Sequence, residues 1–286
     1  MDPRRRASPL HAARASAGCG LCAALALVAL LYDHPLVLGA VLVAVLGAGI
    51  AAGVGRALLR AALFALPFTL IVALINPLVT HEGLTVIARL GTLPVLGQLD
   101  VTLEATAYGA VLGMRALALI LCFALYAAAV DPDEMLRLFR RVSYRSALTA
   151  TLATRMVPML QRDGRRMADA QRCRPGTPAS RVALVRAVAA GALDRAVDVA
   201  AALEVRGYGT ARRPARVVRP WSRHDRAFAA AAVALAALAI GGRLTGVAGF
   251  GAYPQLHRDL GAGTVAFAAA IVLATLLPFC DRRGIG

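Results

Sequence analysis

Six apolar segments separated by polar stretches limit the ways in which this chain can fold. They lie at roughly 18–32, 35–53, 59–79, 103–130, 226–242 and 263–280. About 20 apolar residues are needed for a helix to span the hydrocarbon core of a bilayer. The first two segments are short by this measure, and Tyr32-Asp33-His34-Pro35 between them predicts a helical hairpin. Because 59% of the residues are hydrophobic, we expect an all-α polytopic membrane protein with about six transmembrane helices.

The segments divide the chain into three parts. Residues 1–130 form an N-terminal membrane part with four spans, and residues 226–286 form a C-terminal membrane part with two. Between them, 131–225 is an extended polar region that we expect to hold helices outside the membrane. Pro67 and Pro77 predict kinks in the third span, since proline removes a helical hydrogen bond. The arginine-rich start followed by an apolar run is interpreted as an uncleaved first helix.

The distribution of charge predicts how the chain is oriented. In a soluble protein, a formal net charge of +16 would suggest binding to nucleic acid. Here the arginines flank apolar runs, which is typical of the cytoplasmic side of membrane proteins. Region 131–225 carries 19 Arg against 9 acidic residues, whereas the alternate loops 33–34, 80–102 and 243–262 hold only Arg89, Arg243 and Arg258. We expect a plasma (inner) membrane protein with no nucleic-acid partner and with both termini and 131–225 in the cytoplasm.

All 32 basic residues are arginine, so the chain contains no lysine. A nucleotide-binding P-loop needs a lysine that reaches the phosphates. If nucleotide hydrolysis powers this protein, the hydrolysis must take place in another subunit. The pair Cys19 and Cys22 has half of a zinc-site spacing without a second pair or histidine cluster nearby, and we expect no metal site and no bound cofactor.

Three polar side chains in the spans are candidate functional groups. Glu104 and Arg115 lie in the fourth span and Asn76 precedes Pro77 in the third. Ionisable groups at membrane depth are often functional. Structural roles are the alternative: Arg115 can bond a neighbouring backbone, Glu104 can lie at the interface, and Asn76 can satisfy a carbonyl that the proline kink frees. Glu104 and Arg115 are too far apart to pair along one helix.

The polar region predicts two long helices, at about 146–174 and 180–206. In the first, an apolar stripe recurs at spacings of four, four and three residues, through Leu148, Leu152, Met156 and Met159. In the second, the stripe is made of smaller residues that permit close helix crossing, namely Leu184, Val188, Gly191 and Ala192. Pro175-Gly176 ends the first helix and Gly207 provides a C-cap for the second.

The two helices end in similar sequences, with their final arginines 32 positions apart: Ala170-Gln171-Arg172-Cys173-Arg174 and Ala202-Leu203-Glu204-Val205-Arg206. Each Ala and Arg at i, i+4 share a helix face. The small alanine lets another surface approach, and the arginine supplies a rigid fork of donors. An arginine in the last turn also suits the helix dipole of an ordinary solvated helix. The repetition, with matched alanines, favours two docking ends for two similar partners.

At these residues the chain resembles the transmembrane T component of energy-coupling factor (ECF) transporters, the EcfT/CbiQ/BioN family. The resemblance covers most of the chain, and its motifs occur in family order: His34-Pro35-Leu36-Val37-Leu38, Ile75-Asn76-Pro77-Leu78, Glu104, Gly113-Met114-Arg115, Asp131-Pro132, Arg155-Met156-Val157-Pro158 and the two Ala-x-x-x-Arg ends. Of these, Ala-Leu-Glu-Val-Arg-Gly-Tyr-Gly is the most specific.

This resemblance implies a non-catalytic coupling subunit in a vitamin or transition-metal-ion importer. Two ABC-type ATPases would use ATP and bind the helix ends, and a small membrane S component would hold the substrate. Arg174 and Arg206 would dock the ATPases, with Ala170 and Ala202 allowing contact and Cys173, Val205 and Gly207 flanking the arginines. The first end departs from the family pattern, which is usually Ala-Arg-Gly or Ala-Arg-Ser, because Pro175 follows Arg174.

Two other functions are compatible with a polytopic chain. A self-contained secondary transporter would need polar groups that converge in the membrane, and only Arg115, Glu104 and Asn76 are candidates. An intramembrane enzyme would need a catalytic motif, and no His-x-x-Glu-His, Gly-x-Ser-x-Gly or paired-aspartate pattern occurs in the spans. We therefore name no catalytic residue.

Overall fold

The computed structural model describes residues 8–79, 86–93, 97–139, 144–173, 175, 180–207, 220–247, 249–251, 257–258 and 261–281. The chain forms two compact units. The first, here called the membrane unit, comprises Met1–Met135 and Trp221–Gly286. The second, the polar unit, comprises Leu136–Pro220. The residues on either side of the polar unit are therefore packed together although they are far apart in sequence.

Six apolar helices build the membrane unit: α2 (Ala15–Leu31), α3 (Pro35–Ala51), α4 (Gly55–Val79), α5 (Leu103–Ala129), α9 (Arg223–Leu244) and α10 (Ala262–Leu276). A short α1 (Pro9–Ala12) precedes them and a 3₁₀ turn, η1 (Leu277–Phe279), follows α10. These helices confirm the six predicted segments. By length and composition α4, α5, α9 and α10 with its 3₁₀ extension are candidate membrane spans, while α2 and α3 have 17 residues each.

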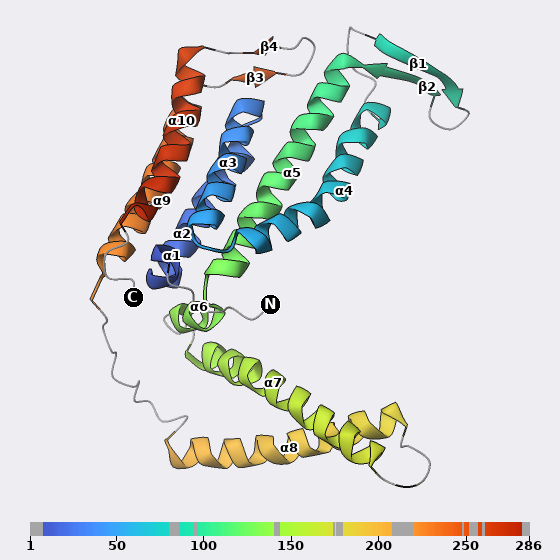
Figure 1. Cartoon of the computed structure of the whole chain (residues 1–286), viewed down its shortest axis with the longest axis vertical. Helices are drawn as coiled ribbons and strands as arrows, with labels where there is room; N and C mark the ends of the chain where they lie inside the picture. The colour runs from blue at the N-terminus through green and yellow to red at the C-terminus, as the bar shows by residue number, and fades with distance from the viewer. Residues whose placement is uncertain are drawn as a thin grey trace. The chain divides into compact units, whose positions relative to one another are not determined.

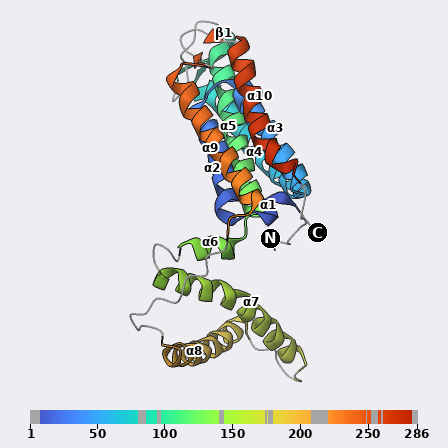
Figure 2. The same cartoon turned by 90° about the vertical axis from the view of Figure 1, so that its left-hand side faces the viewer.

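The helices lie side by side as a bundle (Figures 1 and 2). Contacts join α2 to α9, α3 to α10, and both α2 and α3 to α5. Fully buried side chains at these contacts include Leu25, Leu38, Leu121, Leu235 and Ile271. The core of the unit is therefore shared by all parts of the membrane sequence, from the first span to the last.

Helix α4 packs mainly on α5, with small residues at the contact. A Cβ on Gly109 would lie 2.5 Å from the backbone oxygen of Ala73, and a Cβ on Gly113 would lie 2.9 Å from that of Thr69. The two glycines follow a Gly-x-x-x-Gly spacing, which lets membrane helices approach closely. Figure 1 shows α4 bent along its length, as expected for a helix that contains Pro67 and Pro77. Its opposite face exposes large apolar side chains, with Phe64 86% exposed, which suits contact with lipid.

Two short antiparallel hairpins occur in segments that the sequence marked only as loops. The first pairs β1 (Val86–Leu93) with β2 (Gly97–Thr102), with irregular register between Arg89 and Thr92. The second pairs β3 (Phe250–Gly251) with β4 (His257–Arg258). The part of the fold that spans the membrane is nevertheless all-α, as predicted.

The polar unit is built from α7 (Tyr144–Arg172) and α8 (Arg181–Val205), preceded by the short α6 (Pro132–Phe139), whose first residues belong to the membrane unit. Ser180 caps α8 by accepting a hydrogen bond from the backbone N–H of Ala183 at 3.2 Å. The observed bounds agree with the two predicted helices to within two residues.

Candidate functional site

Helices α7 and α8 contact each other through the faces that the sequence predicted. On α8 the half-buried residues include Leu184, Val188, Gly191 and Ala192, which form the predicted small-residue stripe. At the crossing, the methyl Cγ2 of Val188 lies 3.9 Å from where a Cβ on Gly164 would be. On α7 the prediction holds for Leu148, Leu152 and Met156, which are half-buried, but Met159 is 41% exposed.

An ion pair joins the two helices next to this apolar contact. The guanidinium of Arg195 on α8 donates a hydrogen bond to the carboxylate of Asp163 on α7, with 2.9 Å between Nη1 and Oδ2. Along its own helix, Arg195 also has Asp198 at the i, i+3 spacing. The structure pairs it with the other helix instead, because the side chain of Arg195 lies on the half-buried face of α8 while Asp198 lies on the exposed face.

The end of α8 presents an arginine on an accessible surface. Arg206 is the C-cap, and its backbone N–H bonds the carbonyl of Ala202 at 3.2 Å. Gly207 follows with φ of 78°, the left-handed conformation that glycine adopts readily, so the predicted glycine C-cap is confirmed. The side chains of Ala202 and Arg206 are exposed, and Val205 is 90% exposed.

The end of α7 is similar where the structure describes it. Ala170 and Cys173 are exposed, and the helix ends at Arg172. Arg174, the predicted docking residue at this end, lies outside the described residues. In Figures 1 and 2 the C-terminal ends of α7 and α8 lie on opposite sides of the helix crossing.

Helix α8 also has a face that α7 does not cover. None of its side chains is buried. Large apolar residues on this face are spaced by three, eight and four positions, with Val182 69%, Val185 67%, Leu193 70% and Val197 68% exposed. An exposed apolar stripe of this kind in a polar unit is typical of a surface that binds another protein or a membrane.

Within the membrane unit, Arg115 connects α5 to the turn between α2 and α3. Its Nε donates to the carbonyl of Ala29 at 3.1 Å, and one Nη donates to the carbonyl of Tyr32 at 3.2 Å. The same Nη also bonds the carboxylate of Asp33. The structural role that the sequence left open for Arg115, bonding to a neighbouring backbone, is thus confirmed.

The other two intramembrane candidates lie elsewhere. Glu104 is in the first turn of α5 and only 4% exposed, so its carboxylate is buried within the protein. Asn76 is half-buried on α4, where its Cβ is 3.2 Å from the Cβ position of Gly109 on α5. Arg115 makes its described contacts with the α2–α3 turn, so the structure does not gather the three candidates into one polar site.

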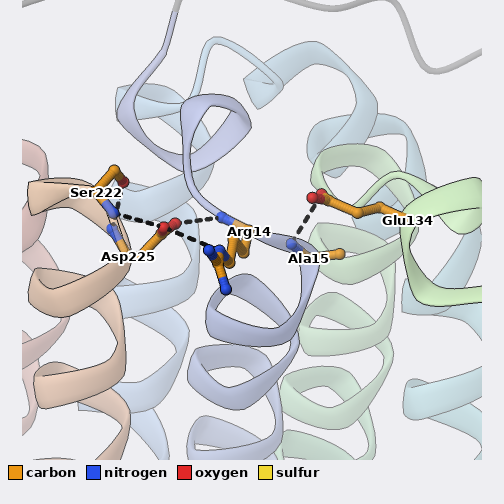
Figure 3. A network of polar contacts seen from close by, with 5 residues as sticks. All are labelled: Arg14, Ala15, Glu134, Ser222 and Asp225. Carbon is orange, nitrogen blue, oxygen red and sulfur yellow. Dashed lines mark hydrogen bonds and ion pairs between the residues drawn. The ribbon is translucent and has the colours of Figure 1, made fainter. Parts of the chain in front are cut away.

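A polar network at the start of α2 was not predicted (Figure 3). Asp225 in the first turn of α9 is fully buried, and its carboxylate accepts a hydrogen bond from the backbone N–H of Arg14 at 2.7 Å. It also pairs with the Nε of Arg14 at 3.2 Å. Asp225 and Ser222 form a reciprocal capping box that begins α9. The guanidinium of Arg14 lies 5.4 Å from the ring centre of Trp221, within the range of a cation–π contact.

The same network includes α6. The carboxylate of Glu134 accepts a hydrogen bond from the backbone N–H of Ala15 at 3.0 Å, as Figure 3 shows. Glu134 lies in the first turn of its own helix, α6. The Ser-x-x-Asp spacing of Ser222 and Asp225 was a readable sign of a helix start, whereas no sequence signal shows that Glu134 and Asp225 both reach the N-terminus of α2.

Among the described residues no group of three or more His, Cys, Asp or Glu could hold a metal ion. A cavity of about 310 Å³ lies between α2 and α5 and is lined mainly by apolar side chains, together with Cys19, Cys22, Cys122 and Tyr126. Its lining includes no charged side chain.

A protein-family model matches residues 6–216 of the chain. The model is described as CbiQ, cobalt transport protein. The match covers most of the membrane unit and all of α6, α7 and α8, including both Ala-x-x-x-Arg ends. No curated protein matches the chain.

Proposed function

This chain belongs to the CbiQ cobalt transport protein family, and we propose that it is the coupling subunit of an ECF-type uptake transporter. As a member of this family it is a membrane transport component. In the proposed complex, two ABC-type ATPases bind the ends of α7 and α8, and a small membrane S component holds the substrate. The ATPases hydrolyse ATP, and this chain transmits their movement to the S component without catalysing a reaction itself.

The observation that best supports this proposal is the pair of accessible helix ends on one polar unit. Arg206 and Ala202 are exposed at one end, and Ala170 and Cys173 are exposed at the other. The two ends lie on opposite sides of the helix crossing (Figures 1 and 2). Two similar ends that point apart are suited to two similar partners, one at each end.

The uncovered apolar stripe of α8 supports a further protein partner. Val182, Val185, Leu193 and Val197 expose large apolar side chains on this face, and removing apolar surface from water favours association. We assign this face to the S component, whose movement the coupling helices would drive.

The orientation and cargo follow from the same proposal. The arginine-rich polar unit and both termini lie on the cytoplasmic side of the plasma membrane, where the ATPases have access to ATP. The family description favours cobalt among the vitamins and transition-metal ions compatible with this transporter class. The ion is the transported substrate and is held by the S component.

Substitution of Arg206 tests the docking proposal. Arg206→Glu should abolish co-purification of ATPase chains in a mild detergent while leaving membrane insertion unchanged, because loss of a buried interface charge pair costs about 2–5 kcal/mol. Arg181→Glu is the matched control, since it makes the same charge change at an exposed arginine of the same helix, away from the apolar face. Co-purification that is equal for the two variants would contradict the assignment of Arg206.

Arg174→Glu should weaken the complex as well. The effect should be smaller than at Arg206, because Pro175 follows Arg174, where the family pattern usually has glycine or serine. Wild-type chain that purifies without any ATPase, yet transports a solute after reconstitution, would show a self-contained carrier and reject the coupling function.

A further inference from the structure

We propose that the Asp163–Arg195 ion pair is a pin that fixes the crossing of α7 and α8 and thereby sets the distance between the two docking ends. This inference rests on the proposed function, because it gives Asp163 and Arg195 a positioning role for the binding of two ATPases at once. Neither residue is placed in contact with an ATPase. Both act on docking through the helices that carry them.

The ion pair is placed where it can determine the crossing. Its charged atoms are 2.9 Å apart across the two helices, and the side chains are only 25% and 37% exposed for Asp163 and Arg195. The other ion pair of the polar unit among the described residues, Arg172–Asp169, lies within one helix at 3.7 Å with both side chains more than 70% exposed. A pair within one helix cannot influence the angle between two helices.

Apolar packing at the crossing is too sparse to fix the angle without help. Helix α8 buries none of its side chains. A Cβ added to Gly191, on the predicted crossing face, would meet no atom within 4 Å, and at Gly164 it would meet only Val188, at 3.9 Å. Small residues let helices slide or rotate over one another, whereas an arginine–carboxylate bond has a directional geometry. The ion pair is therefore the contact that favours this crossing angle between α7 and α8 over slightly different angles.

The pin is nearly the same distance from both docking ends. Helix α7 continues nine residues beyond Asp163, to Arg172, and α8 continues ten residues beyond Arg195, to Val205. At 1.5 Å per residue the two arms are about 14 Å and about 15 Å long. The two helix segments beyond the ion pair are thus nearly equal in length. With the crossing fixed, they would place the two docking ends symmetrically, which suits the binding of two similar ATPases.

Distances between the two ends test the pin in the full chain without any ATPase. Spin labels would be placed on native Cys173 and on Val205→Cys, which are both exposed, after Cys19 and Cys280 are replaced by Ser. In lipid nanodiscs the parent chain should give one narrow distance distribution. Arg195→Asp and Asp163→Arg should each broaden it, and the doubly exchanged Asp163→Arg/Arg195→Asp chain should restore it.

Two further variants separate loss of the ion pair from misfolding and from a general effect of charge on α8. Arg195→Gln should broaden the distribution even if the charge-reversed chains do not fold, and Arg186→Asp on the same helix should leave it narrow. Unchanged distances in Arg195→Gln would overturn the proposal. Failure of the double exchange to restore the narrow distribution would also overturn it, because the two side chains would then act independently.

Binding of the ATPases gives the functional readout. On chains without spin labels, Arg195→Gln should lower the affinity for the second ATPase by about tenfold, equivalent to about 1.4 kcal/mol, with the first ATPase bound as before. Equal binding of both ATPases despite a broadened distance would overturn the positioning role. If the unmodified chain binds no ATPase, the proposed function fails, and the distances still report whether the ion pair fixes the crossing.

Discussion

At the scale of single residues, the most informative side chain in the membrane unit is Arg115. Its guanidinium satisfies the carbonyls of Ala29 and Tyr32 at the end of α2 and pairs with Asp33. A buried helix end needs partners for its last carbonyls, and a guanidinium has five donors with which to reach several of them. Arg115 therefore closes the end of α2 from another helix.

Arg115→Met should destabilise the membrane unit by about 2–3 kcal/mol, because hydrogen bonds from a charged donor are lost and the carbonyls of α2 lose a partner. The measurement is chemical unfolding in detergent micelles. Arg60→Met is the control, since the Arg60 side chain is exposed on α4. An Arg115→Met chain as stable as the control would show that the turn is held by other contacts.

The sequence revealed the role of Arg115 only in part. An arginine within an apolar span must find a partner or reach water, so bonding to backbone was one of the two alternatives considered. Asp33 as its partner was not predicted, because the two residues are 82 positions apart and their proximity depends on how α5 packs beside the α2–α3 turn. The buried position of Glu104 was missed for the same reason.

At the scale of elements, the contact between α4 and α5 depends on the two glycines of α5. Gly109 and Gly113 place the backbone of α5 directly against Ala73 and Thr69. The Gly-x-x-x-Gly spacing is visible in the sequence and is typical of close helix pairs in membranes. Which helix occupies that face could not be read from the sequence, since several apolar helices of similar composition were available.

Gly109→Ala should destabilise this helix pair by about 1–3 kcal/mol, because the added Cβ would lie 2.5 Å from the Ala73 carbonyl oxygen and α4 would have to move. Gly39→Ala in α3 is the matched control. No atom would lie within 4 Å of its new Cβ, and alanine favours a helix by up to about 1 kcal/mol over glycine. Thermal unfolding of both variants in the same detergent would compare them directly, and equal melting temperatures would contradict the close contact.

The helices of the polar unit were the easiest elements to predict. Breaker residues after Arg174 and Gly207 after Arg206 gave their ends, and periodic small or apolar residues gave the face of α8 that meets α7. The partner of Arg195 was not predictable, because pairs along one helix can be read from spacing while a pair between helices requires their crossing point. The two hairpins were missed because the segments 80–102 and 243–262 were considered only as loops.

At the scale of the whole molecule, the membrane unit is closed by contacts between distant parts of the chain. Arg14 and Asp225 are 211 positions apart and Ala15 and Glu134 are 119 apart. Both carboxylates bind backbone N–H groups at the start of α2, where the helix dipole favours negative charge. The number and order of the spans could be predicted from hydropathy. The contacts of Asp225 and Glu134 with the start of α2 could not, because nothing in the local sequence around each residue indicates its distant partner.

Asp225→Ala should reduce the free energy of unfolding of the membrane unit by about 3–5 kcal/mol, since it removes one partner of a buried ion pair together with the cap of α9. Chemical unfolding followed through Trp221, which lies beside Arg14, would report the loss. Asp198→Ala, at an exposed carboxylate of α8, should have no comparable effect. A small change for Asp225→Ala would show that apolar packing alone holds α2 to α9.

The absence of any buried side chain in α8 has a consequence for a cell that makes this chain without its partners. A helix without a core opens often, and proteases cleave segments that open often. We expect brief trypsin treatment of the purified chain to cut α8 at Arg186 or Arg195 before it cuts α9, and bound ATPases with the S component to delay the cleavage. Proteases in the cell would then degrade copies of the chain that lack partners, so that the amount of the coupling chain would follow the amount of its partners.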